Sequence, residues 1–219
     1  MPATGGEQFQ AERAAMVELQ LRNRGISDPR VLEAMGRVPR HEFVAPAQWS
    51  EAYADRPLAI GENQTTSQPY MIAAMLEAAS IKPEYRALEV GTGSGYQTAL
   101  IAELAREVFS IERYPALVES ARQVLQRLGY NNVTIVEGDG SLGLPGHAPF
   151  DVIIVSAAAP AVPPALVAQL APHGRLLVPV GDASDQVLKL VRRRDGEIEV
   201  RTMEGCRFVP LVGEQGFRR

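Results

Sequence analysis

Three glycines and two carboxylates around one predicted turn are the residues of this sequence best suited to chemistry. Residues 86–95 read Arg-Ala-Leu-Glu-Val-Gly-Thr-Gly-Ser-Gly, so an apolar strand ends at Val90 in a turn that contains Gly91, Gly93 and Gly95. Glycine adopts positive φ readily and lets a ligand lie directly against the backbone. The next apolar run, 108–111, ends at Glu112. A doubly wound α/β fold holds a nucleoside in this way, with backbone N–H groups at the turn and a carboxylate on the ribose hydroxyls.

The spacing of the glycines favours one nucleoside cofactor over another. The dinucleotide fingerprint is G-x-G-x-x-G, and its third glycine would occupy position 96, which is Tyr96. Glu89 places a carboxylate directly before the turn, where it would repel a pyrophosphate but attract a cofactor with an ammonium and a sulfonium. The pattern therefore favours S-adenosyl-L-methionine and disfavours an NAD-dependent oxidoreductase. A glycine-rich turn alone also fits an ordinary tight turn, and Glu112 is what favours the cofactor interpretation.

A third cofactor contact is suggested by Gly138-Asp139-Gly140, which follows the predicted strand 133–137. The carboxyl ends of neighbouring strands line the ligand crevice in such sheets, and an aspartate there can accept a hydrogen bond from an adenine amino group. The same tripeptide also fits an Asx turn flanked by flexible glycines. Acidic or glycine-rich features at three successive strand ends together favour the cofactor interpretation.

Length and composition narrow the class of protein. The chain has 219 residues, 46% of them hydrophobic and 22% charged, which suits one globular α/β domain with an extension. The net charge of −4 gives no general reason to expect a nucleic-acid partner. The one cysteine, Cys206, excludes an internal disulfide and is expected to be a small buried hydrophobe in a reducing compartment. Without a long apolar stretch or a leader pattern, we expect a cytoplasmic protein with no membrane partner.

Strand and helix patterns alternate from residue 86 onward and predict a doubly wound, mostly parallel sheet covered on both faces. The predicted strands are 86–90, 107–111, 133–137, 150–155 and 174–180, and the predicted helices are 96–105, 115–128 and 163–170. The carboxyl-terminal part differs. Two strand-like runs, 187–191 and 198–203, flank Asp195-Gly196 and predict an antiparallel hairpin. The arginine run 192–194 is expected to be the solvated end of that hairpin.

The amino-terminal part, 1–80, is predicted to be a helical extension that forms one compact unit with the cofactor-binding part, 81–219. Residues 8–24 are predicted to be helical and to end before Gly25. A second helix is predicted to begin with Asp28 as N-cap and Pro29 in its first turn, and to end at Met35.

The rest of the extension has weaker patterns. Residues 1–6 are expected to be a frayed tail, and residues 37–61 are expected to be irregular because prolines recur in them. A third helix is predicted over 70–79, with Thr66 or Ser67 as its cap.

Several separated motifs together resemble the protein-L-isoaspartate O-methyltransferase family over roughly residues 15–213. The segments Thr-x-Ser-x-Pro and Arg-Phe-Val-Pro-Leu are much more specific than the glycine turn, which any related methyltransferase can carry. The matching residues are Val38-Pro39-Arg40-His41-Glu42-Phe43-Val44, Gln64-Thr65-Thr66-Ser67-Gln68-Pro69-Tyr70-Met71, Leu88-Glu89-Val90-Gly91-Thr92-Gly93-Ser94-Gly95-Tyr96-Gln97-Thr98, Gly138-Asp139-Gly140, Ala148-Pro149-Phe150-Asp151, Pro179-Val180-Gly181 and Arg207-Phe208-Val209-Pro210-Leu211.

The resemblance implies a repair enzyme with a Rossmann-like methyltransferase fold. Asparagine and aspartate residues of ageing proteins cyclise to a succinimide, which reopens largely to isoaspartate. The family transfers a methyl group from S-adenosyl-L-methionine to the α-carboxylate of the isoaspartyl residue. The ester then recyclises spontaneously, which gives the residue another chance to return to normal aspartate.

The resemblance also implies roles for individual residues. Ser67 is expected in the active site, with the segment from Gln64 to Ser67 lying over the methyl donor. The peptide substrate is expected to contact Ser67, Gln68, Val209, Pro210 and Leu211. Together with the residues argued from the turn, the expected cofactor contacts are Gln64, Thr65, Thr66, Glu89, Gly91, Thr92, Gly93, Gly95, Glu112, Arg113, Gly138, Asp139 and Gly140.

The chemistry requires no general base and no metal. A carboxylate with an unperturbed pKa of roughly 4 is already ionised at neutral pH and can attack a sulfonium methyl directly. His41, His147 and His173 are therefore expected to form hydrogen bonds in loops. Ser67 is expected to donate a hydrogen bond to the substrate carboxylate, and a simple helix cap is the alternative role.

The sequence departs from the family pattern at a few positions. Gly61-Glu62-Asn63-Gln64 replaces the common Gly-Gln-Gly-Gln or Gly-Phe-Gln-Ala, Thr66 replaces a common isoleucine, Tyr70 falls where some relatives have histidine, and Val212 where some have threonine. These departures affect the expected peptide preference. The alternatives are a methyltransferase acting on a small molecule or RNA, and a non-catalytic nucleoside-binding module. A monomer is the expected state.

Overall fold

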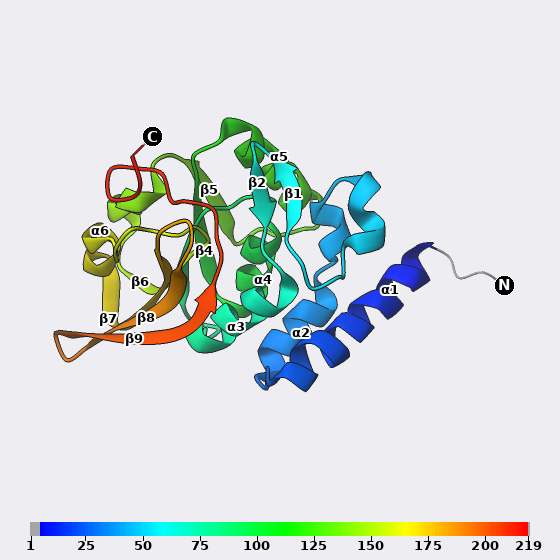
Figure 1. Ribbon diagram of the computed structural model, residues 1–219, viewed down its shortest axis with the longest axis horizontal. Helices are drawn as coiled ribbons and strands as arrows, with labels where there is room; N and C mark the ends of the chain where they lie inside the picture. The colour runs from blue at the N-terminus through cyan, green and yellow to red at the C-terminus, as the bar shows by residue number, and fades with distance from the viewer. Residues whose placement is uncertain (1–4, 219) are drawn as a thin grey trace.

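A seven-stranded sheet forms the centre of the molecule, in the strand order β5-β4-β3-β6-β7-β8-β9. The computed structural model describes residues 5–218 (Figure 1). Neighbouring strands from β5 to β7 are parallel, whereas β8 and β9 are antiparallel. All predicted strands are confirmed, and β7, β8 and β9 are longer than predicted. The strands are β3 (Arg86–Val90), β4 (Glu107–Glu112), β5 (Val133–Glu137), β6 (Phe150–Val155), β7 (Leu170–Gly181), β8 (Gln186–Arg194) and β9 (Glu197–Cys206).

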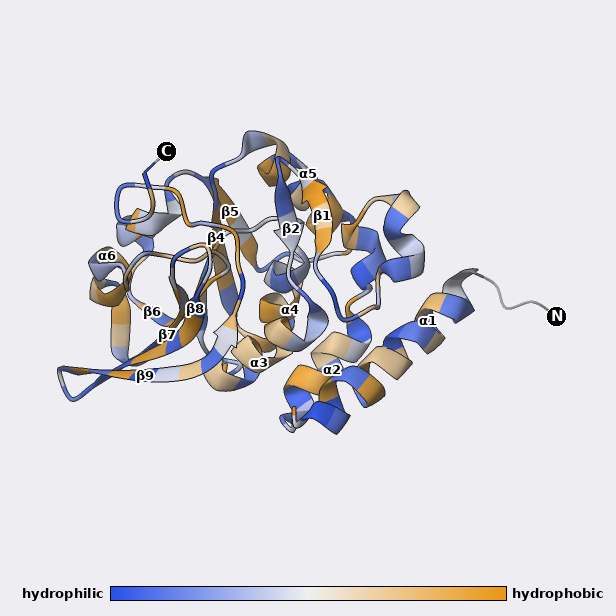
Figure 2. Ribbon diagram, viewed as in Figure 1, coloured by the Kyte–Doolittle hydropathy of each residue, from blue (hydrophilic) through white to orange (hydrophobic). Residues whose placement is uncertain are grey.

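Helices cover both faces of this sheet, as the alternating pattern predicted. The helices of this part are α3 (Pro69–Ala79), α4 (Tyr96–Leu104), α5 (Pro115–Arg127) and α6 (Pro164–Ala168). The predicted helix 163–170 is too long, because Leu170 already pairs with Phe150 as part of β7. Two clusters of buried apolar side chains fill the space between the layers. Figure 2 shows the apolar residues concentrated on the central strands, while the tip of the β8–β9 hairpin is hydrophilic.

The amino-terminal extension is helical, but its first helix changes type along its length. It runs through α1 (Gly5–Ala15), a π-helical segment (Met16–Leu21) and a 3₁₀ turn (Arg22–Arg24), and it ends at Gly25, whose φ is 98°. Part of the expected tail, residues 1–4, lies outside the described residues. Gly5 and Gly6 belong to α1, so for them the prediction was wrong.

The second helix, α2 (Pro29–Arg37), begins as predicted. The side chain of Asp28 accepts a hydrogen bond from the backbone N–H of Arg30 at 2.9 Å, and Pro29 occupies the first turn. The helix continues to Arg37, two residues beyond the predicted end at Met35.

Residues 37–61, predicted to be irregular, contain regular structure. Two 3₁₀ helices, Arg40–Phe43 and Pro46–Glu51, precede a small antiparallel hairpin of β1 (Leu58–Gly61) and β2 (Gln64–Thr66). Sequence reasoning missed the hairpin because its turn has no glycine at its centre. Glu62 and Asn63 adopt φ values of 50° and 55° instead.

The cap of α3 also differs from the prediction. The residue before the helix is Gln68, which makes no side-chain cap, so neither Thr66 nor Ser67 has that role. Asp55 caps the helix from a distant position in the chain, since its Oδ1 accepts a hydrogen bond from Tyr70 N at 2.9 Å. A cap supplied by a separate loop leaves the Ser67 hydroxyl free for another role.

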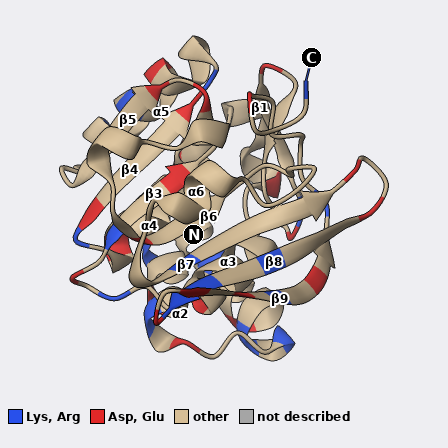
Figure 3. Cartoon of the chain, turned by 90° about the vertical axis from the view of Figure 1, so that its left-hand side faces the viewer, with Lys and Arg blue, Asp and Glu red and all other residues tan. Residues whose placement is uncertain are grey.

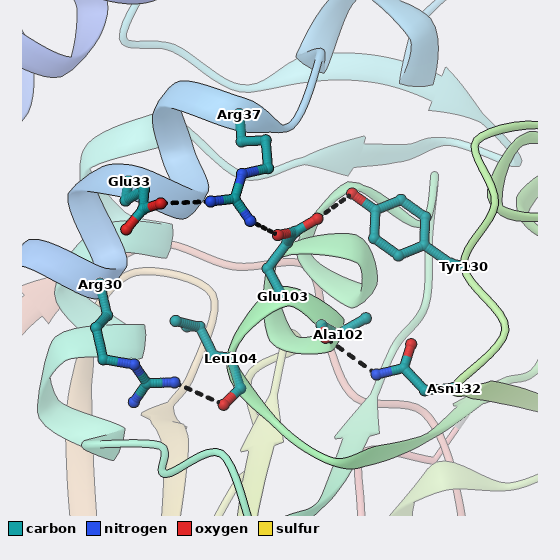
Figure 4. A network of polar contacts seen from close by, with 8 residues as sticks. All are labelled: Arg30, Glu33, Arg37, Ala102, Glu103, Leu104, Tyr130 and Asn132. Carbon is teal, nitrogen blue, oxygen red and sulfur yellow. Dashed lines mark hydrogen bonds and ion pairs between the residues drawn. The ribbon is translucent and has the colours of Figure 1, made fainter.

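Polar contacts attach the amino-terminal extension, residues 5–80, to residues 81–218, which we call the sheet-bearing part (Figure 4). Arg37 of α2 donates a hydrogen bond to Glu103 of α4 at 2.6 Å, and Tyr130 donates one to the same carboxylate at 3.2 Å. Arg30 donates to the carbonyl of Leu104 at 2.8 Å. The extension and the sheet-bearing part also share one apolar core.

The surface carries charges of both signs. Figure 3 shows lysine and arginine interspersed with aspartate and glutamate over the helices and strand ends. No helix within residues 5–218 is long and apolar enough to cross a membrane.

Candidate active site

A cavity at the carboxyl edge of the parallel strands brings together segments that are far apart in the chain. We call it the first cavity. It lies between the ends of β3, β4 and β6 on one side and the β1–β2 hairpin and residues 209–212 on the other. Its lining consists of Ile60, Gln64, Thr65, Thr66, Ser67, Ile72, Glu89, Val90, Gly91, Thr92, Gly93, Ser94, Gln97, Ile111, Glu112, Arg113, Tyr114, Gly140, Ser156, Ala157, Val209, Pro210, Leu211 and Val212.

The glycines of the turn have different roles. Gly91, Gly93 and Gly95 all have positive φ, at 93°, 54° and 87°, which favours glycine at each position. Gly91 and Gly93 line the first cavity, whereas Gly95 does not. Gly95 is the residue before α4, and a Cβ there would lie 3.3 Å from Ala121 Cβ. Gly95 therefore permits close packing of the turn on α5, and its predicted direct contact with the cofactor stays a proposal.

Glu112 ends β4 and holds the surrounding backbone in place. Its Oε2 accepts a hydrogen bond from Gly93 N at 3.0 Å, and its Oε1 accepts from the N–H groups of Arg113 and Tyr114 at 2.8 and 3.1 Å. The side chain is buried but lines the first cavity. An ionised carboxylate has about four acceptor sites, so these three bonds leave room for a ligand hydroxyl.

Glu89 lies completely buried beneath the turn. Its carboxylate accepts hydrogen bonds from Thr98, from Ser110 at 2.7 Å and from Gln97 Nε2 at 3.2 Å. Burial raises the pKa of the Glu89 carboxyl to about 7, although these three hydrogen bonds act in the opposite direction. The site therefore holds a carboxyl group that titrates near neutral pH next to the first cavity.

Asp139 forms the Asx turn that the sequence left open as an alternative. Its Oδ1 accepts hydrogen bonds from the N–H and the hydroxyl of Ser141, and its Oδ2 accepts from Glu214 N at 2.8 Å. Burial by itself would raise the pKa of Asp139, but the hydrogen bonds from Glu214 and Ser141 outweigh it and lower that pKa. Neither Asp139 nor Gly138 lines the first cavity, whereas Gly140 does. Asp139 thus ties the carboxyl-terminal loop to the end of β5.

Ser67 lies where the first cavity meets a second one. The second cavity is lined by Pro57, Thr65, Ser67, Gln68, Met71, Ser156, Gly205, Cys206, Arg207, Phe208 and Val209. Four residues, Thr65, Ser67, Ser156 and Val209, line both cavities. The predicted substrate residues Ser67, Gln68 and Val209 therefore border the second cavity, while Pro210 and Leu211 border only the first.

A buried arginine positions the segment that carries Ser67. The Nη2 of Arg40 donates hydrogen bonds to the carbonyls of Ser67 at 3.0 Å and Arg56 at 3.2 Å. Arg40 is fully buried, and burial lowers its pKa. Its Nε and Nη1 have no hydrogen-bond partner among residues 5–218. Arg40 belongs to the Val-Pro-Arg-His-Glu-Phe segment, which therefore supports the Ser67 segment without lining either cavity.

The segment 209–212 is held against the end of β6 by backbone hydrogen bonds. Ala158 N donates to Val209 O at 2.8 Å, and Leu211 N donates to Ala158 O at 2.7 Å. Arg113 Nη1 donates to Val212 O at 2.8 Å, so the predicted cofactor residue Arg113 also anchors this segment.

Sequence reasoning missed several residues of the site. Ser156 and Gln97 line the first cavity and hydrogen-bond to each other at 2.7 Å. Position 156 follows the clearest buried strand of the sequence, which is a signal that could have identified it. Ile60 and Tyr114 also line the cavity. Ile60 belongs to the hairpin that was not predicted.

The residues expected to have other roles lie outside the first cavity. His41 bonds to the Tyr53 hydroxyl at 2.7 Å, and burial lowers its pKa. The ring of His147 packs on Phe109.

Arg193, within the run expected to be solvated, donates to the carbonyl of Leu170 at 2.9 Å. Cys206 is half-buried in the second cavity, and burial raises the pKa of its thiol to about 11. No group of three or more residues able to hold a metal ion is found among residues 5–218.

Comparison with known proteins identifies the family. Residues 11–216 match the family model described as protein-L-isoaspartate(D-aspartate) O-methyltransferase. The chain is 53% identical over 209 residues to the protein-L-isoaspartate O-methyltransferase of Koribacter versatilis (strain Ellin345), covering 95% of this chain and 94% of the relative. It is 52% identical over 211 residues to that of Trichlorobacter lovleyi, covering 96% and 97%.

Solved structures agree with the sequence relatives. A protein-L-isoaspartate O-methyltransferase structure matches with a TM-score of 0.83 and 31% identity, over 93% of this chain and 67% of that one. A Plasmodium falciparum structure described as a β-aspartate methyltransferase, in complex with S-adenosyl-L-homocysteine, matches with a TM-score of 0.80 and 29% identity, over 91% and 98%. The chain belongs to the protein-L-isoaspartate(D-aspartate) O-methyltransferase family.

Proposed function

We propose that this protein transfers a methyl group from S-adenosyl-L-methionine to the free α-carboxylate of L-isoaspartyl residues in damaged proteins and peptides, which initiates their repair through a succinimide. Membership of the family supports this assignment. The single structural observation that carries it is the junction of two cavities at Thr65, Ser67, Ser156 and Val209. A group transfer between two bound molecules needs such a junction.

The first cavity fits the methyl donor in charge and shape. Two carboxylates, Glu89 and Glu112, line it, and the one guanidinium in its lining, Arg113, is engaged with Val212 O. This balance suits a ligand with a sulfonium and an ammonium. A Cβ at Gly140 would approach Val90 Cγ1 to 2.6 Å, so glycine allows this part of the lining to pack closely on the end of β3. Apolar side chains of the lining, such as Ile111 and Leu211, suit the flat adenine ring.

The residues of the two cavities have separate roles in the proposed reaction. Glu112 accepts from the ribose hydroxyls, Glu89 keeps the methionine end of the cavity negative, and the glycine turn provides space. Ser67 donates a hydrogen bond to the substrate carboxylate at the junction. When bound, S-adenosyl-L-methionine supplies an electrophilic methyl group, and the new O–CH₃ bond forms as the S–CH₃ bond breaks with its electron pair passing to sulfur. No proton moves, so the residues act by orienting two oppositely charged groups and excluding water.

The second cavity suits a peptide with an acidic group. Its lining contains Arg207 and no acidic side chain. Part of the proposal is that the protein acts as a cytoplasmic monomer on protein and peptide substrates, without nucleic-acid or membrane partners. A net charge of −4 and a single cysteine support this part.

The test uses the full chain, S-adenosyl-L-methionine labelled in the methyl group, and two peptides that differ only in one isoaspartyl or aspartyl residue. We expect base-labile label on the isoaspartyl peptide alone. Equal labelling of both peptides, or labelling of an RNA or small-molecule acceptor only, would contradict the proposal.

A further inference from the structure

Ser156 lies at the junction of the two cavities, at the carboxyl end of the sheet strand β6. It follows β6 directly, and its backbone N–H donates to Val90 O at 2.8 Å, which places it beside the start of the glycine turn. It lines both cavities, as Ser67 does. A Cβ at Gly91 would lie 3.5 Å from Ser156 Cβ, so the glycine turn passes close to this side chain.

The hydrogen bonds around Ser156 determine which way its hydroxyl acts. Gln97 Nε2 donates to Ser156 Oγ at 2.7 Å and also to Glu89 Oε1 at 3.2 Å. In its ionised form, which its three hydrogen bonds favour, Glu89 can only accept, so the NH₂ end of the Gln97 amide points toward Glu89 and Ser156. Ser156 Oγ therefore serves as an acceptor for Gln97. Its own hydrogen is not donated to any group among residues 5–218, and it remains available at the junction.

A second donor at the junction would hold the substrate carboxylate more firmly than one donor can. A substrate carboxylate has two oxygens with about four acceptor sites. If the Ser67 hydroxyl is its one donor, the carboxylate can still rotate about that hydrogen bond. Neutral hydroxyls suit this task better than a cation would. An arginine bound to the nucleophile stabilises its charge most before the reaction, when that charge is largest, and so raises the barrier.

We propose that Ser156 is a second catalytic hydroxyl, which donates a hydrogen bond to the isoaspartyl α-carboxylate together with Ser67 and fixes its orientation toward the methyl group. Gln97 and Glu89 are the positioning residues that direct the Ser156 hydrogen to the substrate. The inference rests on the proposed function, because it assigns the second donor for that substrate.

The test compares Ser156→Ala and Ser156→Thr with the wild-type protein, at saturating S-adenosyl-L-methionine and varied isoaspartyl peptide. Loss of a hydrogen bond to a charged group predicts a drop in kcat/KM of about tenfold or more for Ser156→Ala. Ser156→Thr keeps a hydroxyl and is expected to retain most of the activity. Binding of S-adenosyl-L-homocysteine, measured by calorimetry, is expected to change less than threefold in both variants. Ser120→Ala, on an exposed face of α5, is the matched control.

Two further variants separate a catalytic role from a structural one. Ser67→Ala and the double variant Ser67→Ala/Ser156→Ala form a cycle, and the two losses should be non-additive if both hydroxyls hold the same carboxylate. Gln97→Leu keeps the Ser156 hydroxyl but removes its orientation, so it should lower kcat by a smaller factor than Ser156→Ala. Thermal unfolding followed by circular dichroism checks that each variant is folded.

The outcomes distinguish this inference from the proposed function. Unchanged peptide kinetics in folded Ser156→Ala, or a defect limited to binding of S-adenosyl-L-homocysteine, would overturn the role of Ser156 and leave the proposed function standing. Wild-type protein that binds S-adenosyl-L-homocysteine but does not methylate the isoaspartyl peptide would overturn both.

Discussion

At the scale of single residues, the site depends on two carboxylates with different surroundings. Backbone N–H groups satisfy Glu112, whereas Glu89 is buried among the side chains of Gln97, Thr98 and Ser110. Burial raises the pKa of Glu89 to about 7, so its charge changes near neutral pH. The sequence marked both positions as acidic, but it could not show that one of them titrates in the working range.

This difference predicts a pH dependence of cofactor binding. A bound cation favours the ionised form of Glu89, so binding of S-adenosyl-L-methionine should tighten as the pH rises from 6 to 8 and should release a proton near pH 7. Each unit by which the cation lowers the pKa increases the affinity about tenfold. Calorimetry in buffers of different ionisation enthalpy measures the proton release.

The control for this prediction is Glu89→Gln, which removes the titrating group.

The same carboxyl group also affects the stability of the fold. Its pKa is higher in the folded protein than in the unfolded chain, so the folded state binds the extra proton between about pH 4.5 and 7 and loses stability as the pH rises through that window. Glu89→Gln should flatten both profiles, and exposed Glu84→Gln should flatten neither. An unaltered proton release in Glu89→Gln would contradict the assignment.

At the scale of elements, the segment with Ser67 is positioned by residues that do not line the first cavity. Arg40 donates a hydrogen bond to the carbonyl of Ser67, and Asp55 caps the α3 helix that follows. Asp55 also forms an ion pair with Arg24, whose guanidinium lies 3.6 Å from the centre of the Tyr70 ring. The Asp55 carboxylate therefore joins the loop that carries it to Arg24 and to the start of α3.

The cap predicts a measurable loss of stability. Asp55→Ala should lower the free energy of unfolding by about 1–2 kcal/mol, because it leaves Tyr70 N without its acceptor. Asp55→Asn keeps an acceptor oxygen but loses the charge, so it should cost less than half as much. Urea denaturation measures both. Equal stability of the two variants would show that the cap contributes nothing and that only the ion pair matters.

At the scale of the whole molecule, the extension and the sheet-bearing part share one apolar core. Met35 of α2 is fully buried in it, and Tyr96 at the start of α4 donates its hydroxyl to the Met35 sulfur at 3.8 Å. Tyr130 packs against this core, and its hydroxyl and Arg37 both donate to the carboxylate of Glu103 (Figure 4). A shared core couples the folding of the segment that carries Ser67 to the folding of the sheet.

This coupling predicts a single unfolding transition. Met35→Ala should lower the free energy of unfolding by about 2–5 kcal/mol because it leaves a cavity in the shared core. The sole tryptophan, Trp49, reports on the extension by fluorescence, and circular dichroism reports on the whole molecule. Both midpoints in urea should fall together.

The matched control is Leu19→Ala, since Leu19 is 63% exposed and should cost little. A Met35→Ala variant whose fluorescence transition moves while the circular dichroism transition stays in place would show two separately folding parts.

The sequence by itself determined which strands and helices follow one another along the chain from residue 86 onward, and most of the segments that form the site. Strand 150–155 and the glycine turn could be located from the chain because burial and positive φ each restrict which residue types a position accepts. The 58–66 hairpin could not, because its turn relies on Glu62 and Asn63 in a conformation that glycine more often supplies.

Only the tertiary structure decided what each polar side chain does. Asp139 ties down a loop, Asp55 caps a helix 15 residues ahead, and Ser156 joins Ser67 at the junction of the two cavities. The physical reason is that hydrogen bonds and charges act over a few ångströms in space, between groups that the chain separates by tens of residues. Residue type shows what a side chain is able to do, and the fold supplies its partner.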